Sequence, residues 1–222
     1  MTHAPSDLRS DSSLRPTVGP LEIMRPTEVA DSYDRIAARW TDPDFDLSNG
    51  IEQHKRAIEF TAQRGAALDV GCGSSSRLLD LLRSKRFSVE GLDISAEMLR
   101  LAREAHPEGT FHHADICDWV ASKPYDLISA WDSIWHLPLP QQQSVLVKLC
   151  SALASGGVFI FTAGCVDVPD ERRDSHMGVP KYHASLGVPR ICSLLAEGGC
   201  SLRHFGFDQY PQSHVYFIAQ RA

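Results

Sequence analysis

The sequence predicts an α/β fold: a doubly wound, mostly parallel seven-stranded sheet with helices on its faces. Apolar runs of strand length alternate with segments that carry apolar residues at helical spacing, from residue 66 to residue 197. Strands separated by helical lengths form parallel sheets, because a parallel pair needs a long crossover connection. The last two apolar runs are joined by a short turn at Tyr210-Pro211, so one strand must run antiparallel.

The expected elements follow one another in a regular order along the chain. Two helices, at residues 28–40 and 52–64, precede the first strand. The seven expected strands cover residues 66–71, 87–92, 110–114, 125–131, 157–163, 200–207 and 213–220, and the helices between them cover residues 75–85, 95–105, 140–154 and 187–197. The first helix places Val29, Tyr33 and Trp40 on one apolar face. Ser95 is expected to cap helix 95–105.

Composition favours one globular domain over residues 29–222, preceded by a flexible arm at residues 1–28. The chain has 222 residues, of which 43% are hydrophobic and 23% charged, and its formal net charge is -6. This acidic balance, with no basic block, argues against nucleic acid as the main partner. No apolar run approaches the ~18 residues that a membrane span needs, and the first residues lack the apolar core of a secretion signal. We therefore expect no membrane partner, a cytoplasmic location and a monomer or homodimer.

A strand, a glycine turn and a helix follow one another between residues 66 and 82, an arrangement typical of nucleotide-binding loops. Gly71 and Gly73 permit positive φ and leave bare backbone against which a ligand can lie. Ser74 or Ser75 can cap the helix, because a hydroxyl accepts from its first free amides. The sequence therefore places a ligand at the carboxyl end of the first strand.

Two carboxylates near this turn favour an aminoacyl nucleoside over a dinucleotide. A dinucleotide fingerprint needs a third glycine where this chain has Ser76. Asp69 would repel a pyrophosphate but attract an ammonium or sulfonium group. Asp93 ends the second strand, where a carboxylate can accept from two ribose hydroxyls. A nicotinamide-dependent oxidoreductase is also disfavoured because the chain lacks a Tyr-x-x-x-Lys pair.

Five segments resemble, in order and spacing, the successive motifs of class I S-adenosylmethionine-dependent methyltransferases. They read LDVGCGSSS, VEGLDISAEML, HHADICDW, YDLISAWDSIWHLP and LASGGVFIFTAG, and YDRIAARW before them resembles the family's N-terminal helix. The small-molecule branch, with the trans-aconitate and quinone-biosynthesis enzymes, is most similar. The resemblance covers roughly Tyr33 to Ala222 and departs from the family at Ser75, where many members have a third glycine.

The resemblance implies a Rossmann-like methyltransferase fold and S-adenosyl-L-methionine as the cofactor. The expected cofactor-binding residues are Tyr33, Asp69, Gly71, Cys72, Gly73, Asp93, Ile94, Met98, Asp115, Ile116 and Trp131. Within this set, the resemblance implies that the Asp115 carboxylate accepts from the adenine amino group and that Ile116 packs near the ring. It also implies that the helices within residues 29–64 form a lid over the mouth of the site.

The loop after the fourth expected strand faces the reactive methyl group in the family that this chain resembles. Asp132 and His136 are the candidate catalytic residues, and Trp40, Trp135 and Tyr182 are the candidate substrate-binding residues. We expect a nitrogen or oxygen nucleophile rather than carbon or sulfur, with Asp132 placed to take its proton. The alternatives are that Asp132 caps the following turn and that His136 is structural.

Other interpretations remain open from the sequence alone. His112, His113, Asp115 and Cys117 are potential metal ligands, but no second cluster completes a tetrahedral set, so no metal is expected. The same fold can carry a non-catalytic S-adenosylmethionine-binding protein, or a methyltransferase that acts on a protein or nucleic acid. The segment 164–187 is long for a loop and is expected to form part of the substrate wall.

Overall fold

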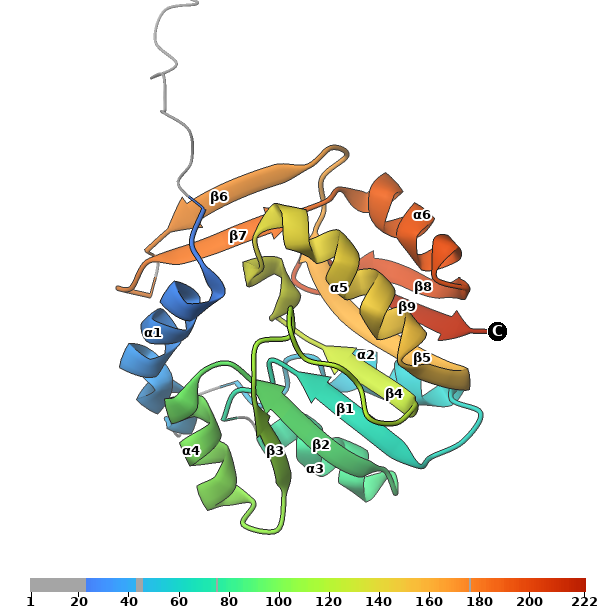
Figure 1. The fold of residues 1–222 in the computed structure, drawn as a ribbon, viewed down its shortest axis with the longest axis horizontal. Helices are drawn as coiled ribbons and strands as arrows, with labels where there is room; N and C mark the ends of the chain where they lie inside the picture. The colour runs from blue at the N-terminus through green and yellow to red at the C-terminus, as the bar shows by residue number, and fades with distance from the viewer. Residues whose placement is uncertain (1–22, 43–45, 75, 176) are drawn as a thin grey trace, which may run out of the picture.

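A seven-stranded sheet forms the centre of the molecule (Figure 1). The computed structural model describes residues 23–42, 46–74, 76–175 and 177–222. The strands of the main sheet are β1 (Ala66–Val70), β2 (Ser88–Asp93), β3 (Thr110–His113), β4 (Tyr125–Ala130), β5 (Leu153–Gly164), β8 (Cys200–Phe207) and β9 (His214–Arg221). Their order is β3-β2-β1-β4-β5-β9-β8, and β9 runs antiparallel to both of its neighbours. The predicted mostly parallel sheet of seven strands is confirmed.

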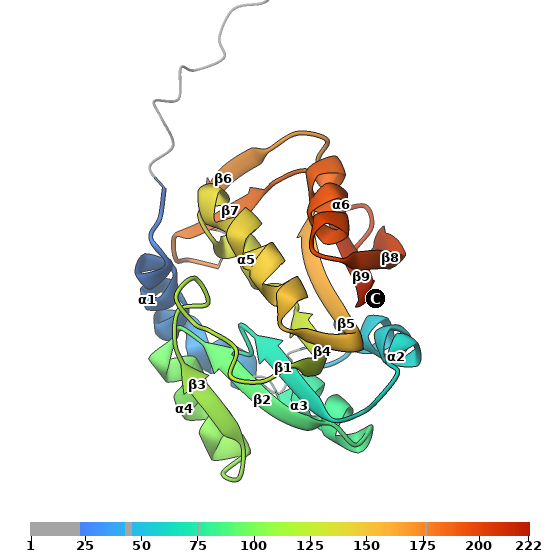
Figure 2. The same ribbon diagram turned by 45° about the vertical axis from the view of Figure 1, so that its right-hand side comes forward.

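Helices cover both faces of this sheet. They are α1 (Pro26–Ile36), α2 (Ile51–Phe60), α3 (Ser76–Ser84), α4 (Ala96–Ala105), α5 (Leu139–Ser151) and α6 (Val188–Glu197), with short 3₁₀ turns η1 (Ala37–Thr41) and η2 (Ile134–His136). Figure 2 shows α5 and α6 together over the near face. Alternation along β5 explains the two layers, because Phe159 and Phe161 pack in the cluster with α5 and α6, whereas Val158 and Ile160 pack in a cluster with α2 and α3.

The boundaries differ from the sequence prediction mainly before the first strand. The helix expected at 28–40 is α-helical only to Ile36 and continues as the 3₁₀ turn η1. It also begins earlier, at Pro26, so residues 26–28 of the expected flexible arm belong to α1. Residues 1–22 of that arm lie outside the described part of the chain. Helix α2 ends at Phe60, before the expected residue 64.

The segment 164–187, expected as a loop, contains a separate antiparallel hairpin. Its strands are β6 (Asp170–Asp174) and β7 (Lys181–Ser185). The hairpin lies beyond one end of the main sheet, between α1 and α6 (Figure 1). Tyr182 and Ala184 hold it there, because they are buried with Met24 and Val29 in a small apolar cluster. The sequence of β6 is Asp-Glu-Arg-Arg-Asp, which has no apolar alternation from which a strand could be predicted.

Across the described residues, no helix has the length and apolar character needed to cross a bilayer.

Candidate functional site

A cavity of about 440 Å³ opens at the carboxyl ends of the first four strands. All eleven residues expected to bind the cofactor line it: Tyr33, Asp69, Gly71, Cys72, Gly73, Asp93, Ile94, Met98, Asp115, Ile116 and Trp131. Four of the expected acceptor-site residues line it as well: Trp40, Asp132, Trp135 and His136. Tyr182 does not. The location is the one expected for a ligand in an open α/β sheet.

The glycine turn after β1 needs its glycines for conformation and for space. Gly71 has φ +69° and Gly73 has φ +57°, in the left-handed region that other residues rarely adopt. A Cβ on Gly71 would lie 2.3 Å from the Cβ of Ser133, so only glycine lets the turn pass the loop after β4. Of the two candidate caps of α3, Ser75 lies outside the described residues, and the Ser74 hydroxyl has no hydrogen-bond partner among those described.

Asp93 ties the glycine turn to the start of α4. Its Oδ2 accepts from the backbone N–H of Gly73 at 2.8 Å, and its Oδ1 accepts from that of Ser95, also at 2.8 Å. Ser95 in turn caps α4, since its hydroxyl accepts from the Met98 N–H at 3.1 Å, as predicted. Burial raises the pKa of Asp93 despite these bonds, which favour the charged form. With backbone bonds from Gly73, Ser95 and Ile94, the carboxylate still has capacity to accept from a ligand.

Asp69 is a buried carboxyl group in the floor of the cavity. It is 2% exposed, and its Oδ2 has no hydrogen-bond partner in the described part of the chain. Burial raises its pKa to about 7, against smaller effects of the nearby Ser129 hydroxyl and Arg77 guanidinium, which lower it. A cationic group of a ligand would satisfy the unpaired oxygen and favour the ionised form.

A chain of hydrogen bonds behind Asp69 favours its neutral form. His54 Nδ1 lies 2.7 Å from the carbonyl oxygen of Gly50, so Nδ1 carries the proton and Nε2 accepts. The Ser129 hydroxyl, 3.0 Å from Nε2, must then donate to His54. Ser129 has no second proton to give to Asp69, so a bond between these two residues needs a protonated Asp69.

Asp115 lies just after the carboxyl end of β3 and lines the cavity. Its Oδ1 accepts from the Cys117 N–H at 2.8 Å. The neighbouring histidines are engaged elsewhere, His112 with Glu90 at 2.9 Å and His113 with the carbonyl oxygen of Ile94 at 3.0 Å. Over the ranges that the structure describes, no three His, Cys, Asp or Glu residues are grouped as they would be around a metal ion.

Asp132 follows β4 in an unusual backbone conformation. Its φ is +52°, and its N–H donates to the Thr162 hydroxyl at 2.9 Å. Its Oδ2 accepts from the Asn49 amide at 3.0 Å, whereas its buried Oδ1 has no hydrogen-bond partner among the described residues. Burial raises its pKa, and the nearby Asp208 carboxylate raises it further. The side chain is therefore held by the segment before α2 rather than by the turn that follows it.

His136 is a buried junction between three elements. Its Nδ1 lies 2.7 Å from the carbonyl oxygen of Tyr182 and therefore donates. Its Nε2 then accepts, with the Tyr33 hydroxyl at 2.7 Å and the Trp135 indole N–H at 3.1 Å. Burial lowers the pKa of His136 to about 3, so the ring is neutral. Its accepting nitrogen is already engaged, as the structural interpretation of this histidine requires.

The expectation that Tyr182 contacts substrate is wrong by one residue. Successive side chains of a strand point to opposite faces. Tyr182 is fully buried, and its hydroxyl accepts from the Leu139 N–H at 3.2 Å. Its neighbours on β7, Lys181 and His183, line the cavity instead.

Lys181 and His183 lie in the segment 164–187 that was expected to form part of the substrate wall, and both line the cavity. Asn49, Arg77, Gln209 and His214 also line it and were not anticipated from the sequence. Alternation around Tyr182 could have indicated Lys181 and His183 once a strand was assumed there. No local pattern marks Asn49 or His214, because they reach the cavity from segments distant in sequence.

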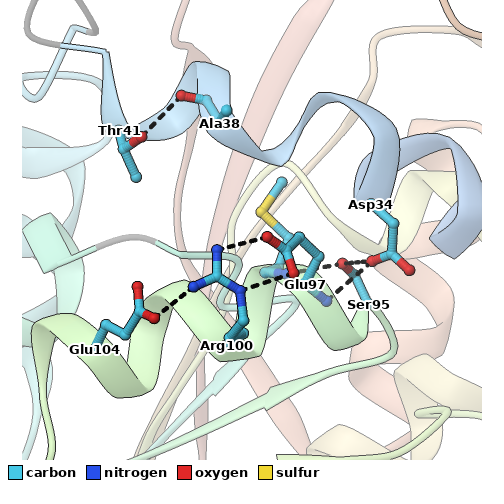
Figure 3. A network of polar contacts seen from close by, with 8 residues as sticks. Asp34, Ala38, Thr41, Ser95, Glu97, Arg100 and Glu104 are labelled. Carbon is cyan, nitrogen blue, oxygen red and sulfur yellow. Dashed lines mark hydrogen bonds and ion pairs between the residues drawn. The ribbon is translucent and has the colours of Figure 1, made fainter.

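Helix α1 closes one side of the cavity and is joined to the start of α4 by hydrogen bonds. Figure 3 shows Asp34 beside Ser95 at the start of α4. The Asp34 carboxylate accepts from the Ser95 hydroxyl and, at 3.1 Å, from the Glu97 N–H. Asp34 therefore satisfies one of the free amides of α4 from a neighbouring helix. Val29 and Tyr33 on the same helix line the cavity.

Comparisons with known proteins agree with this architecture. Residues 67–157 match the sequence model of a family described as "Methyltransferase domain". A trans-aconitate 2-methyltransferase of Rhodopseudomonas palustris is 36% identical over 157 residues, which are 69% of this chain and 55% of that protein. The dTDP-3-amino-3,6-dideoxy-alpha-D-glucopyranose N,N-dimethyltransferase of Streptomyces fradiae is 30% identical over 118 residues, 50% of this chain and 42% of that protein. The chain thus spans about half the length of these curated relatives.

Among solved structures, the magnesium protoporphyrin IX methyltransferase of Synechocystis PCC 6803 superposes with a TM-score of 0.69 at 17% identity, covering 92% of this chain and 100% of that one. An S-adenosylmethionine-dependent methyltransferase from Clostridium acetobutylicum gives a TM-score of 0.64 at 16% identity, covering 88% and 98% of the two chains. The resemblance is confirmed: residues 67–157 match the methyltransferase domain model, and the chain has the fold of these solved methyltransferases.

Proposed function

We propose that this protein binds S-adenosyl-L-methionine and transfers its methyl group to a small-molecule acceptor. The observation that carries the proposal is the pair of buried carboxyl groups beside the glycine turn. Asp69 lines the cavity and has an oxygen without a partner among the described residues, and Asp93 sits at the end of the neighbouring strand. An aminoacyl nucleoside suits both, since it offers an ammonium group and two ribose hydroxyls. The relatives named as methyltransferases of trans-aconitate and of an amino sugar support a small acceptor.

In this proposal each cavity residue has a defined task. Asp93 accepts from the ribose hydroxyls, Asp69 faces the ammonium group, and Asp115 accepts from the adenine amino group. Gly71 and Gly73 let the ligand lie against backbone. When bound, the cofactor supplies an activated methyl group on a sulfonium, whose departure leaves a neutral thioether.

The acceptor end is built around Asp132. A nitrogen or oxygen nucleophile that carries a proton must lose it when it attacks the methyl carbon, and a carboxylate within hydrogen-bonding reach can take that proton. The buried, unpartnered Oδ1 of Asp132 supports this role. The tryptophans on either side, Trp131 and Trp135, wall the cavity and exclude water. Trp40 extends the same wall from η1.

Calorimetry tests the cofactor part of the proposal. We expect S-adenosylmethionine and S-adenosylhomocysteine to bind and NADH not to bind. Replacing Asp93 by Ala leaves the ribose hydroxyls unpaired, which costs about 1.5–3 kcal/mol and weakens binding roughly tenfold to a hundredfold. Tight NADH binding with no heat from S-adenosylmethionine would overturn the proposal.

Turnover separates an enzyme from a non-catalytic binding protein. A panel of small amines, alcohols and acids is incubated with S-adenosylmethionine, and release of S-adenosylhomocysteine is followed. At least one acceptor should raise the release well above the rate without acceptor. Cofactor binding without acceptor-dependent release across the panel would favour the binding protein.

A further inference from the structure

We propose that the acceptor carries a carboxylate group that binds to Lys181, an inference that rests on the methyl-transfer function proposed above. Lys181 begins β7 and lines the cavity. It is only 7% exposed. Among the described residues, its ammonium group has no hydrogen-bond or ion-pair partner. Burying an ammonium without a partner is costly, so a ligand that supplies one gains binding free energy.

The charges around Lys181 favour the binding of one anionic group. Asp174 lies opposite Lys181 in the hairpin, but its carboxylate is directed to His183, with Oδ2 and Nε2 3.0 Å apart. Asp174 raises the pKa of Lys181, whereas burial, the largest effect, and the nearby Arg39 guanidinium lower it. Arg39 adds a second positive charge at this end of the cavity. A carboxylate would pair with the ammonium directly.

The other cation in the lining is already balanced by acids. Among the described residues that line the cavity, Lys181 is the lysine and Arg77 is the arginine. Burial lowers the pKa of Arg77, whereas the nearby charges of Asp132, Asp69 and Asp46 raise it. It also donates through Nε to the carbonyl oxygen of Asn49 at 2.9 Å. Lys181 is therefore the better candidate for a group brought by the acceptor.

Lys181 belongs to the acceptor end of the cavity. His183, on the same face of β7, has its ring centre 4.7 Å from that of His136 and 6.0 Å from that of Trp135. The ring of His214 lies 4.7 Å from that of Trp135, and His214 is close enough to Asp132 to lower its pKa. Trp135 therefore contacts both a histidine of the strand that carries Lys181 and a histidine near Asp132.

This arrangement defines a class of acceptor. Its nucleophilic N–H or O–H group lies at Asp132, its carboxylate lies at Lys181, and its body rests against Trp135. Small amino acids, hydroxy acids and polycarboxylic acids satisfy this description. A phosphate dianion fits less well, because it brings a second negative charge to a place where the Asp174 carboxylate is already near.

A matched set of aromatic probes tests the assignment. Benzoate, benzamide and phenyl phosphate share a ring and differ in charge, and binding to the S-adenosylhomocysteine complex is followed through the indole N–H signal of Trp135, identified with Trp135→Phe. We expect benzoate to bind at least roughly tenfold more tightly than benzamide and more tightly than phenyl phosphate, as loss of one charge-assisted bond implies. Equal affinity for benzoate and benzamide overturns the proposal, and preference for phenyl phosphate overturns the carboxylate.

Variants give an independent test. Lys181→Met should lower benzoate affinity roughly tenfold to a hundredfold, and Lys181→Arg should retain most of it. Lys85→Met, an exposed lysine outside the cavity, should change nothing. Unchanged benzoate affinity in a folded Lys181→Met protein overturns the proposal. The probe comparison on the unaltered chain decides the matter even if this variant does not fold.

Failure of the cofactor proposal is distinguishable from failure of this one. Calorimetry of S-adenosylhomocysteine reports on the residues around Asp69 and Asp93, which lie at the other end of the cavity. If that ligand does not bind, the methyl-transfer function fails, while the preference for benzoate over benzamide in the ligand-free protein still decides whether Lys181 is an anion site.

Discussion

At the scale of single residues, Asp132 combines two costs, one in its backbone and one in its side chain. A non-glycine residue at positive φ is uncommon and is kept only when its surroundings hold it there. The Thr162 hydroxyl and the Asn49 amide supply those constraints. The buried Oδ1 is left without a partner in the described structure, which also costs free energy. Costs of this kind gather at functional sites, where the strained group has a task.

Asp132→Asn separates the catalytic role from the capping role. Asparagine keeps the shape, tolerates positive φ and can still accept from Asn49, but it cannot take a proton. We expect near-normal cofactor affinity and a rate loss of ~100-fold or more, in the range of a lost general base. The measurements are steady-state release of S-adenosylhomocysteine with an identified acceptor and calorimetry of the cofactor. A variant that turns over at the wild-type rate would show that Asp132 is not the base.

Most of the candidate site was predictable from the sequence, and the side chains that the β6–β7 hairpin directs to the cavity were not. Asp69, Asp93 and Asp115 lie at or just after the carboxyl ends of strands in one continuous segment, so the rule that ligands bind there locates them. Lys181 and Tyr182 lie in a segment expected as a loop, where the sequence does not indicate which side chains face the cavity. In β7 neighbouring side chains point to opposite faces, so Lys181 lines the cavity and Tyr182 does not.

At the scale of elements, α1 with η1 is the part of the site that depends most on tertiary contacts. It is joined to α4 through Asp34, to η2 through Tyr33 and to β7 through Val29. The apolar face of α1 was readable from its spacing. Its partners were not, because Asp34 and Ser95 are 61 residues apart and nothing local links them.

We expect ligand binding to slow hydrogen exchange in residues 26–41 more than in the main sheet. Val29 and Tyr33 line the cavity, so a bound ligand stabilises the closed position of α1. Mass spectrometry with and without S-adenosylhomocysteine measures the effect. Equal protection in both states would assign α1 a static packing role.

Asp34→Ala provides the control for this measurement. Loss of the cap on α4 costs about 1 kcal/mol, which corresponds to exchange in α1 that is roughly fivefold faster in the ligand-free protein. Exchange in α5 and α6, on the near face of the sheet, should not change. Acceleration throughout the chain would instead indicate global destabilisation.

At the scale of the whole molecule, the fold follows from few rules. Alternating strands and helices require parallel pairs with crossovers, and the closing hairpin forces one antiparallel strand. The structure confirms both features. What the pattern could not supply is the β6–β7 hairpin, since β6 is polar and its pairing with β7 depends on the cluster around Tyr182.

Buried titratable groups around the cavity change the free energy of unfolding of the whole molecule in opposite directions as pH changes. Burial raises the pKa of Asp69, Asp93 and Asp132, and lowers the pKa of His54 to about 4 and of His136 to about 3. The acids make the folded state bind more protons than the unfolded chain, and the histidines make it bind fewer. The acids and the histidines therefore make opposing contributions to the pH dependence of the free energy of unfolding. Single variants are needed to separate these contributions.

The contribution of Asp69 can be isolated by comparison with Asp69→Asn. The folded pKa is about 7 and the ordinary value is 3.8, so the folded protein retains a proton that the unfolded chain has lost. Relative to the variant, the free energy of unfolding of the wild type should fall as pH rises through this window, by up to about 1.4 kcal/mol per pH unit. Denaturant titrations of both proteins at several pH values measure it. A parallel pH dependence of the two proteins would contradict the raised pKa.

Binding of S-adenosylhomocysteine should remove the proton from the Asp69 carboxyl group. An ammonium group beside Asp69 favours the carboxylate, and once Asp69 is ionised the Ser129 hydroxyl can turn from His54 to donate to it. At pH 6, where a group with a pKa of about 7 is mostly protonated, binding of S-adenosylhomocysteine should release ~0.9 proton. Calorimetry in two buffers of different ionisation enthalpy measures the released protons. Asp69→Asn should release close to none at this pH, and equal release from both proteins would assign the proton to another group.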